Sequence, residues 1–355
     1  DFFPSSFGLD LSDLSIKLVW LDREGSKDTL ASFGSVPLLP GSVVDGEIVH
    51  TEAVRNAIVD LLHKAGPKKV KSRRVICSLP ETKAFLRIIT LPRMEKEEVS
   101  EAIKWEIEAN IPLTLEQVYY DWQILSAPVT GEKDKLGVLV VAVARSVVDQ
   151  FQAVLESAGL EVEGLDTESI AQARSLLPEA DETKTTLIID IGDRRTSFLI
   201  SIGSTPCFTS SVPLSSQMIT DAIAKELRIS FQEAEDIKIK QGLGSLATKS
   251  PVFRAAQPVL ENLSVEIEKS IDFYLNTFRY SKGIDAIVLC GGGSNMNGLL
   301  PYFSLRLERS VESGNPWVNV RLGDTLPLIS RERSVQYSTA IGLALRGLDE
   351  YEDLA

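Results

Sequence analysis

Two aspartates stand where strand-like apolar segments end, 180 residues apart in the sequence. Asp10 follows Phe7-Gly-Leu, and Asp190 follows Ile188-Ile. A polar turn and a second apolar segment come next, at 12–15 and 16–21 in the first copy and at 192–195 and 196–202 in the second. This order predicts two β-hairpins, each with an acid beside its tip. If the two hairpins face each other across a cleft, the N–H groups of their turns would bind phosphates. The two carboxylates would hold Mg²⁺, which takes oxygen ligands and keeps most of its waters.

Either segment alone has a simpler explanation, because Asp at the end of a strand is favourable turn chemistry. A third segment favours the nucleotide interpretation. Ala286 to Cys290 is an apolar run that predicts a buried strand, and three glycines, Gly291 to Gly293, follow it. Without Cβ atoms a ligand can approach the backbone there, and the helix expected at 299–307 offers free N–H groups. A Rossmann fingerprint is not matched, because Met296 stands where its third glycine is needed.

The order of these three motifs resembles the actin, Hsp70 and FtsA superfamily of nucleotide-binding proteins. Further segments resemble the PilM family of type IV pilus assembly over nearly the whole chain. They are Phe7 to Asp10 with Lys17-Leu-Val, Leu79-Pro-Glu81 with Arg87 and Leu91-Pro92, Ala102 to Glu108 with Ile111-Pro112, Tyr120 to Gln123, Ala234 to Lys238, and Ala340 to Gly347. The resemblance implies an α/β, two-lobed actin-like fold, which is a duplicated ribonuclease H-like fold, with an FtsA-type 1C subdomain.

The resemblance also implies ATP and Mg²⁺ as ligands and a role for each site residue. Asp10 and Asp190 would face the metal from opposite lobes, and Lys17 would contact the phosphates. Phosphate oxygens would meet the turns formed by Ser12, Asp13, Leu14 and Ser15 and by Gly192, Asp193, Arg194, Arg195 and Thr196. The ribose and adenine would lie between Glu235 and Lys238 and the glycine turn, with Gly291, Gly292, Gly293 and Asn295 on the adenosine side. Glu168 would orient the water that hydrolysis requires.

Several of these assignments have open alternatives. Lys17 also fits an exposed strand position, Glu235 and Lys238 also fit a surface ion pair, and Glu168 also fits a helix start within 166–168. Two departures from the family pattern bear on phosphate binding. Ser12 replaces a common glycine, and residues 193–195 replace the Gly-Gly-Thr of Hsp70-like proteins. Either change would weaken ATP binding, raise its dependence on Mg²⁺, or have no effect if the side chains point away. We therefore expect hydrolysis to be slow or absent without partners.

The domain organisation follows from the same resemblance. The expected parts are 1–78 (subdomain 1A), 79–163 (1C), 164–183 (return to 1A), 184–228 (2A), 229–258 (2B), 259–330 (2A) and 331–355 (return to 1A). Periodicity predicts helices at 52–64, 96–109, 147–158, 166–177, 215–227 and 259–278, and strands at 75–79, 84–90, 119–125, 136–144 and 207–212. Residues 229–258 are polar and include a loop-like stretch at 241–247.

Composition narrows the class of protein. The 355 residues include 37 Lys and Arg against 50 Asp and Glu, a net charge of −13 that disfavours nucleic acid or an anionic bilayer as a direct partner. No apolar run is long enough to span a membrane, and the sequence does not begin with a basic signal-peptide region. We expect a cytoplasmic protein. The three cysteines are widely spaced in apolar contexts and only two histidines accompany them, which predicts buried thiols rather than disulfides or zinc.

The function that the resemblance implies is an ATP-binding scaffold recruited to the inner face of the inner membrane. Its partner would be the N-terminal cytoplasmic tail of PilN, in a groove beside the 1C subdomain, with Leu91, Pro92, Ile111 and Pro112 as rim candidates. Other pilus platform proteins, assembly ATPases and self-association stay open. The alternatives are an FtsA-like cell-division filament protein, disfavoured by the acidic residues 347–355, and a cytoplasmic actin-like domain of a type II secretion protein. A small-molecule kinase would need a substrate base, and none is evident.

Overall fold

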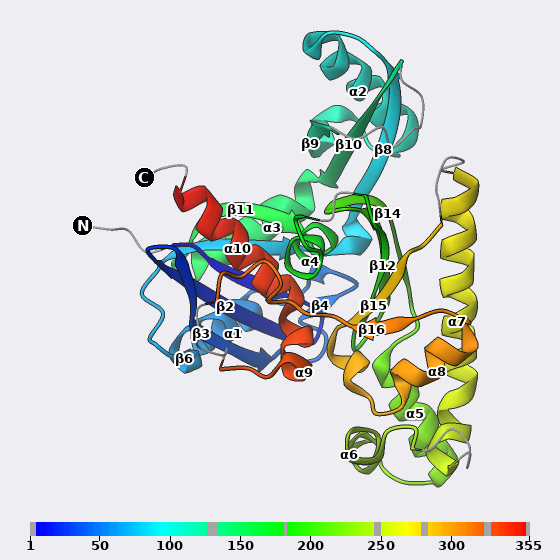
Figure 1. Cartoon of the computed structure of the whole chain (residues 1–355). Helices are drawn as coiled ribbons and strands as arrows, with labels where there is room; N and C mark the ends of the chain where they lie inside the picture. Colours follow the sequence, from blue (N-terminus) through cyan, green and yellow to red (C-terminus); the bar gives the residue numbers. More distant parts are fainter. Residues whose placement is uncertain are drawn as a thin grey trace.

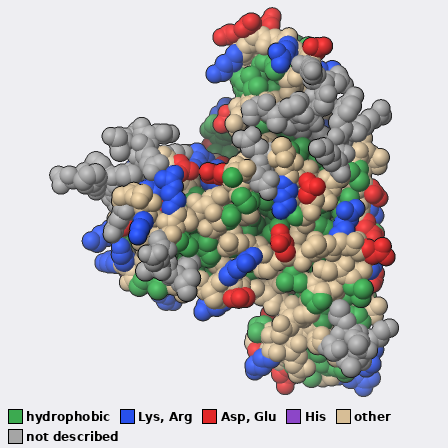
Figure 2. Space-filling view, viewed as in Figure 1, with side chains coloured by type: hydrophobic (Ala, Val, Ile, Leu, Met, Phe, Trp, Pro, Cys, Tyr) green, Lys and Arg blue, Asp and Glu red, His purple; other side chains and the backbone are tan. Residues whose placement is uncertain are grey.

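The computed structural model describes residues 5–125, 134–180, 183–244, 250–277, 283–322 and 328–352. Two lobes lie side by side, each built on one central sheet, and a smaller sheet with its own helix projects beyond them (Figure 1). In the space-filling view this projection stands apart from the lobes (Figure 2). We call the projection, from β8 to β10, the module.

The first lobe is built on a six-stranded sheet with the order β11-β7-β1-β2-β3-β6. Its strands are β1 (Phe7–Leu11), β2 (Ser15–Glu24), β3 (Lys27–Pro37), β6 (Gly66–Pro67), β7 (Arg74–Leu79) and β11 (Glu161–Thr167). Strands β1, β7 and β11 are parallel to one another, and β1, β2 and β3 form an antiparallel meander. A separate two-residue hairpin, β4 (Val43–Val44) and β5 (Glu47–Ile48), follows the meander.

The second lobe repeats this arrangement in its five-stranded sheet, β14-β13-β12-β15-β16. The strands are β12 (Thr185–Ile191), β13 (Thr196–Ile202), β14 (Thr205–Val212), β15 (Ala286–Cys290) and β16 (Val311–Ser313). Again three antiparallel strands come first in the chain and two parallel strands are then added beside the first of them. The predicted duplication is therefore confirmed at the level of topology, because the two sheets share one strand order.

Helices cover both faces of each sheet. The outer face of the first lobe packs on α1 (Thr51–Lys64) and α3 (Arg145–Ser157), and that of the second on α5 (Ser216–Leu227), α7 (Pro251–Thr277) and α8 (Leu299–Arg306). Between the sheets lie α10 (Ser338–Glu352) and α4 (Glu168–Leu176), against the first and the second sheet respectively. The remaining short elements are α6 (Phe231–Gln241), α9 (Arg331–Ser334), η1 (Glu81–Lys83), η2 (Leu115–Gln117), η3 (Gly292–Asn295) and η4 (Val335–Tyr337).

The crossing of α4 and α10 explains the Ala340 to Gly347 motif. A Cβ added at Gly342 would overlap the carbonyl oxygen of Ala171 on α4, so only glycine lets the two helices approach this closely. Asp166 adds a polar clamp, because its carboxylate pairs with Arg174 of α4 at 2.9 Å and with Arg346 of α10 at 3.2 Å. The two central helices are thus fixed to each other beneath the cleft between the lobes.

The module consists of α2 (Lys96–Asn110) packed on the sheet β8-β10-β9, with β8 (Ala84–Pro92), β9 (Val118–Ile124) and β10 (Lys135–Ala144). Val99, Ile103 and Ile107 of α2 are buried against this sheet, as their spacing predicts. Helix α3, which follows β10, instead buries Phe151 and Val154 in the core of the first lobe. The chain therefore leaves the first lobe at η1 and is back in that lobe's core by α3.

Two predicted boundaries are wrong. The helix expected from residue 166 begins at Glu168, because Asp166 and Thr167 end strand β11, which the sequence did not indicate. This strand is mostly polar and pairs on one side only, so its apolar signal is weak. The helix expected from 259 begins at Pro251 and runs through Pro258, and the predicted end at residue 278 lies outside the described residues. The polar character of 229–258 predicts no helix there, but buried Val252 and Phe253 extend the apolar face of α7 toward its N-terminus.

Two further observations concern the chain as a whole. All three cysteines are free and buried, as predicted. Among the residues that the structure describes, no helix combines the length and the apolar character that crossing a bilayer requires.

Candidate nucleotide site

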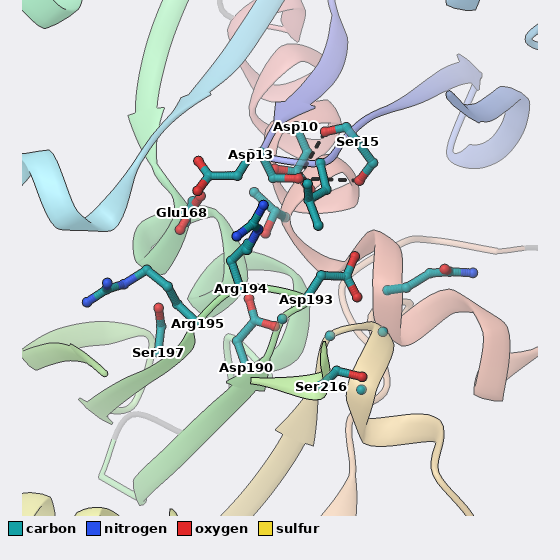
Figure 3. A pocket seen from close by; sticks show the side chains of 18 of the residues that line it. Asp10, Asp13, Ser15, Glu168, Asp190, Asp193, Arg194, Arg195, Ser197 and Ser216 are labelled. Atoms are coloured by element: carbon teal, nitrogen blue, oxygen red, sulfur yellow. Dashed lines mark hydrogen bonds between the residues drawn. The ribbon is translucent and has the colours of Figure 1, made fainter. Parts of the chain in front are cut away.

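A cleft of about 460 Å³ opens between the two lobes, and all but one of the predicted site residues line it. Its walls come from the β1–β2 turn, the β12–β13 turn, the first turn of α4, α6, the glycine turn after β15, and η1. Figure 3 shows Asp10, Asp13, Ser15 and Glu168 on one side and Asp190, Asp193, Arg194 and Ser216 on the other. The cleft therefore brings together motifs that lie up to 280 residues apart in the sequence.

Thr196 is the exception. It is fully buried, and its hydroxyl donates to the carbonyl oxygen of Leu214 at 2.7 Å. The turn closes one residue earlier, through the N–H of Gly192 and the carbonyl of Arg195 at 2.9 Å, so Thr196 is already the first residue of β13. The prediction that it borders the phosphates is therefore corrected by the position of the turn.

The first hairpin holds a buried carboxylate beside a cation. Asp10 accepts hydrogen bonds from Ser78 Oγ at 3.3 Å and from Lys17 Nζ at 3.4 Å. Burial lowers the pKa of Lys17, but the carboxylates of Asp10, Asp190 and Asp193 outweigh it, and the net shift in pKa is upward. Lys17 is thus a fixed ammonium in the cleft and not the exposed strand residue that the alternation also allowed.

The turn of the first hairpin is closed by its own atoms. The N–H of Ser12 donates to the carbonyl of Ser15 at 3.0 Å, and Ser12 Oγ donates to the same oxygen at 2.9 Å. The carboxylate of Asp13 accepts the N–H groups of Asp45 and Gly46 at 3.2 and 3.0 Å. These two residues form the tight turn of the β4–β5 hairpin, where both have positive φ. The negative charge of Asp13 is therefore already stabilised by the N–H groups of a neighbouring turn.

The second hairpin is electrostatically different. Asp190 accepts a hydrogen bond from Gln172 of α4, but burial, and then the nearby Asp10, raise its pKa to about 6. At the turn, Arg195 donates to Ser211 Oγ at 3.0 Å and lies 3.9 Å from Asp45 of the first lobe. Among the described residues, Arg195 is therefore the only residue of this turn that forms an ion pair across the cleft.

The glycine turn after β15 is required by contacts with Asp190 and the strand that carries it. Gly291 has φ +82°, and a Cβ on it would overlap Asp190 Oδ1. A Cβ on Gly293 would lie 2.6 Å from Ile191 Cγ2, whereas one on Gly292 would meet nothing within 4 Å. Two of the three glycines thus permit close packing against Asp190 and Ile191, and Gly292 faces open space.

On the other side of this turn, Lys238 of α6 is almost completely buried. Its Nζ lies 2.8 Å from Glu235 Oε2 and donates to Ser216 Oγ and to Thr220 Oγ1, both at 2.8 Å. A simple surface ion pair would not be buried among hydroxyls of α5. Glu235 and Lys238 instead form a fixed polar edge of the cleft, opposite Gly291 to Asn295.

Glu168 is the first residue of α4, and Thr167 is the helix N-cap, whose Oγ1 accepts the N–H of Ile170. The capping role thus belongs to Thr167 and leaves the Glu168 carboxyl facing the cleft. Burial first, then the carboxylates of Asp10, Glu81 and Asp190, hold the pKa of Glu168 well above its ordinary range.

The structure also adds cleft residues that sequence reasoning missed. Gln172 had no signal, because its role depends on where α4 packs. Asp45-Gly46 is a typical tight-turn pair that would have predicted the β4–β5 hairpin. Glu81 is quoted in the family motif, but nothing in the sequence indicates that it lies beside Glu168.

The donor set fits a hydrated magnesium ion on phosphate better than a metal held by protein alone. Within the described ranges, no group of three His, Cys, Asp or Glu side chains is placed to hold a metal. Asp10 and Asp190 present carboxylates from opposite lobes, and Mg²⁺ commonly binds through one or two carboxylates, waters and phosphate oxygens. The excess of acids around Lys17 also leaves room for a divalent cation in the charge balance of the cleft.

Comparison with known proteins assigns the family. Residues 8–348 match the family model described as "Type IV pilus assembly protein PilM". The chain belongs to the PilM family. A chain of the PilM-PilN type IV pilus biogenesis complex is 27% identical, with a TM-score of 0.80, over 97% of this chain and 98% of that one.

More distant relatives bear out the actin-like fold expected of a PilM protein. The cell division protein FtsA of Pseudomonas aeruginosa is 27% identical over 242 residues, 63% of this chain and 57% of FtsA. FtsA of Neisseria meningitidis is 26% identical over 58% of this chain and 52% of FtsA, so the chain spans little more than half the length of these curated relatives. MreB5 of Spiroplasma citri bound to ADP shares the fold alone, with 13% identity and a TM-score of 0.59, over 99% of this chain and 98% of that one.

Proposed function

We propose that this PilM-family protein is a scaffold of type IV pilus assembly that binds ATP with Mg²⁺ between its lobes and the N-terminal cytoplasmic tail of PilN beside its module. The observation that carries the nucleotide half is the meeting of two duplicated hairpins and a glycine turn in one cleft. Support also comes from MreB5, an actin-like neighbour that is bound to ADP.

In this proposal each wall of the cleft has one task. Lys17 and the two turns bind the phosphates, and Asp10 and Asp190 hold the inner-sphere waters of magnesium. The glycine turn and the Glu235–Lys238 edge enclose the adenosine. Bound magnesium would neutralise phosphate charge and draw the two carboxylates together. Because these groups come from both lobes, ATP would favour a closed arrangement of the lobes.

Titration calorimetry with ATP, with and without Mg²⁺, tests the nucleotide site. We expect saturable binding that requires the metal, and a rise in melting temperature at millimolar ATP. Asp190→Ala should weaken binding and remove its metal dependence. Asp60→Asn, an exposed acid paired with Lys64 on α1, is the matched control and should bind as the native protein does. Absence of heat and of thermal stabilisation would overturn the assignment of the site.

Glu168 is proposed to orient the hydrolytic water, with turnover that is slow without partners. Burial and the neighbouring carboxylates raise the pKa of Glu168, which disfavours the ionised form that a general base must have. Steady-state turnover of tens per second by the purified protein, lost in Glu168→Ala, would contradict this part of the proposal.

The partner half rests on the neighbouring PilM-PilN complex and on the exposed corner between the module and the first lobe (Figure 2). We propose that the module corresponds to subdomain 1C and that PilN, as a membrane protein, brings this chain to the inner membrane. The rim candidates need revision. Leu91 is buried in the module core, and Pro92 pairs with Lys135 at the end of the sheet far from the first lobe. The near end is where Ala84 pairs with Val143.

Titration of a labelled peptide with the sequence of the PilN tail tests this half. We expect saturable 1:1 binding that is lost when residues 84–143 are replaced by an unrelated subdomain. These limits spare α3, whose Phe151 belongs to the first-lobe core. Val143 also packs in that core and is kept as valine, so the chimera should still fold and bind ATP. Retained ATP binding is therefore its internal control. Peptide binding unchanged in the chimera would place the partner on another surface.

A further inference from the structure

Glu81 lies where three parts of the molecule meet. It begins η1, the single turn that follows Pro80 and joins β7 of the first-lobe sheet to β8 of the module. It lines the nucleotide cleft and is 7% exposed. Strand β14 of the second lobe contacts both η1 and β8. A side chain in this place can respond to the cleft and to the module at once.

A hydrogen bond and a like-charge contact join η1 to the first turn of α4. The N–H of Ser169 donates to Glu81 Oε2 at 3.2 Å, across 88 residues of sequence. The carboxylate of Glu81 is also one of the groups that raise the pKa of Glu168, so the two carboxyls influence each other. The surroundings of Glu168 therefore depend on the position of η1.

The carboxyl of Glu81 has a second neighbour and an unpaired atom. Burial raises its pKa, while hydrogen bonding by Ser169 and by Thr209 of β14 lowers it and burial prevails. Its Oε1 has no hydrogen-bond partner at good geometry among the described residues. A buried carboxyl oxygen without a hydrogen-bond partner costs free energy, and the size of that cost depends on how the neighbouring groups are placed. Small movements of β14 or η1 will change its interactions.

We propose that Glu81 is a positioning residue that couples the module to Glu168, so that nucleotide in the cleft and the placement of β8 depend on each other. The contact with two states is the hydrogen bond from the N–H of Ser169 to Glu81, formed when η1 is seated on α4 and broken when the module shifts. Coupling of this kind is reciprocal: what seats η1 favours nucleotide, and nucleotide at Glu168 favours a seated module. The inference rests on the nucleotide binding proposed above.

Amide hydrogen exchange of the full chain with and without Mg-ATP tests the coupling directly. In the native protein we expect slower exchange in both phosphate turns, 12–15 and 192–195, and also in β8, by about five-fold or more. In Glu81→Ala the phosphate turns should stay protected while the protection of β8 is lost. Glu81→Gln keeps an amide oxygen for the N–H of Ser169 and should restore most of it. If the role of Glu81 were merely structural, its loss would change exchange protection in the phosphate turns and in β8 alike.

Lys83→Gln is the matched control. Lys83 lies in the same turn, but its Nζ pairs with Glu47 at 2.6 Å on the surface, so its exchange pattern should equal that of the native protein. Melting temperature measured without nucleotide verifies folding, and Glu81→Leu, which removes the carboxyl but keeps most of the side-chain volume, replaces Glu81→Ala if that variant does not fold. The coupling is overturned if the native protein protects the phosphate turns but leaves β8 unchanged, or if Glu81→Ala protects β8 as well as the native protein does. Either result leaves the nucleotide proposal in place. No protection in either region of the native protein removes the nucleotide proposal together with the coupling.

Discussion

The two hairpins of this chain have one topology but different electrostatics. Asp10 lies opposite Lys17 in the register of the first hairpin, and Asp190 lies opposite Ser197 in the second. The first acid therefore has a cation from its own hairpin. The second has an amide, Gln172, which comes from α4. Duplication preserved the backbone that presents an acid to the cleft and changed the group that compensates it.

Because of this difference, the two lobes would contribute different groups to ligand binding in the cleft. In the proposed site Lys17 would meet phosphate as an ammonium that is already positioned, because Asp10 pairs with it and Asp190 and Asp193 add to the negative field around it. Asp190, with a pKa of about 6, is costly to ionise until a cation is added. Under the proposed function, the first lobe would supply a cation that is in place for phosphate, whereas the second would supply a carboxylate whose charge magnesium would stabilise.

A second difference follows the parallel strand beside each hairpin. In the first lobe β7 ends in Pro80 and Glu81 and continues into the module. In the second lobe β15 ends in Gly291 to Gly293, which pack against Asp190 and its strand. The same edge of the fold therefore carries the module in one copy and, in the other, a glycine turn that lines the cleft.

The largest expected effect breaks the comparison at Lys17. Lys17→Met removes a charge-assisted contact to phosphate and should raise the dissociation constant for Mg-ATP about 10- to 100-fold. It also leaves Asp10 without its cation, so the free protein should melt at a lower temperature. Ser197→Ala, at the equivalent register position, should change affinity less than about two-fold. Calorimetry on both variants measures the contrast, and equal losses would mean that the hairpins are interchangeable.

A smaller effect is expected when Asp190 becomes neutral. Asp190→Asn removes a carboxylate that is ionised at pH 7 against its environment, so the free protein should be more stable by about 1 to 3 kcal/mol. The same change should weaken Mg-ATP binding about ten-fold, with no further loss on adding a chelator. Thermal melts and calorimetry check the two halves. Lower stability of the variant would show that the ionised carboxylate is well compensated in the free protein.

The pH dependence sharpens the same point. The pKa of Asp190 in the folded protein, about 6, exceeds its ordinary value of 3.8. The native state therefore holds the extra proton between these values, and this contribution to stability falls as the pH rises through them. Metal-dependent binding changes in the opposite direction, and at pH 5.5 it should be about four-fold weaker than at pH 7.5. Asp190→Asn corrects for the titration of ATP itself, and an equal pH response in that variant would assign the effect elsewhere.

The part of the site that lies at strand ends could be predicted from the sequence. Asp10, Asp190 and Gly291 to Gly293 each follow a local apolar run that ends in a turn. Contacts that depend on packing between distant segments could not be predicted from the sequence. Gln172 reaches Asp190 only because α4 lies on the second sheet, and Glu81 reaches Ser169 across 88 residues. A single sequence has no periodicity or spacing that records such contacts.

Element boundaries failed for related reasons. Strand β11 is short in apolar residues because it lies at a sheet edge, where only β7 supplies its hydrogen bonds. Proline is normally excluded from helix interiors, yet α7 contains Pro258. In both places tertiary contacts outweighed the local preference, whereas α1 and α2 follow their apolar spacing because one face of each is buried.

The smallest expected effect concerns the second residue of each turn, Asp13 and Asp193. The carboxylate of Asp13 already caps the Asp45–Gly46 turn, so Asp13→Asn should leave ATP affinity unchanged and cost about 0.5 to 1 kcal/mol of stability. Asp193 instead adds to the negative field at Lys17 and Asp190, and that field repels phosphate. Asp193→Asn should therefore strengthen Mg-ATP binding about two-fold, more at low salt than at high salt. Binding isotherms at two ionic strengths measure this, with Asp13→Asn as the control. Weaker binding in Asp193→Asn would mean that Asp193 helps to hold the metal, and the second turn would then contribute two acids where the first contributes one.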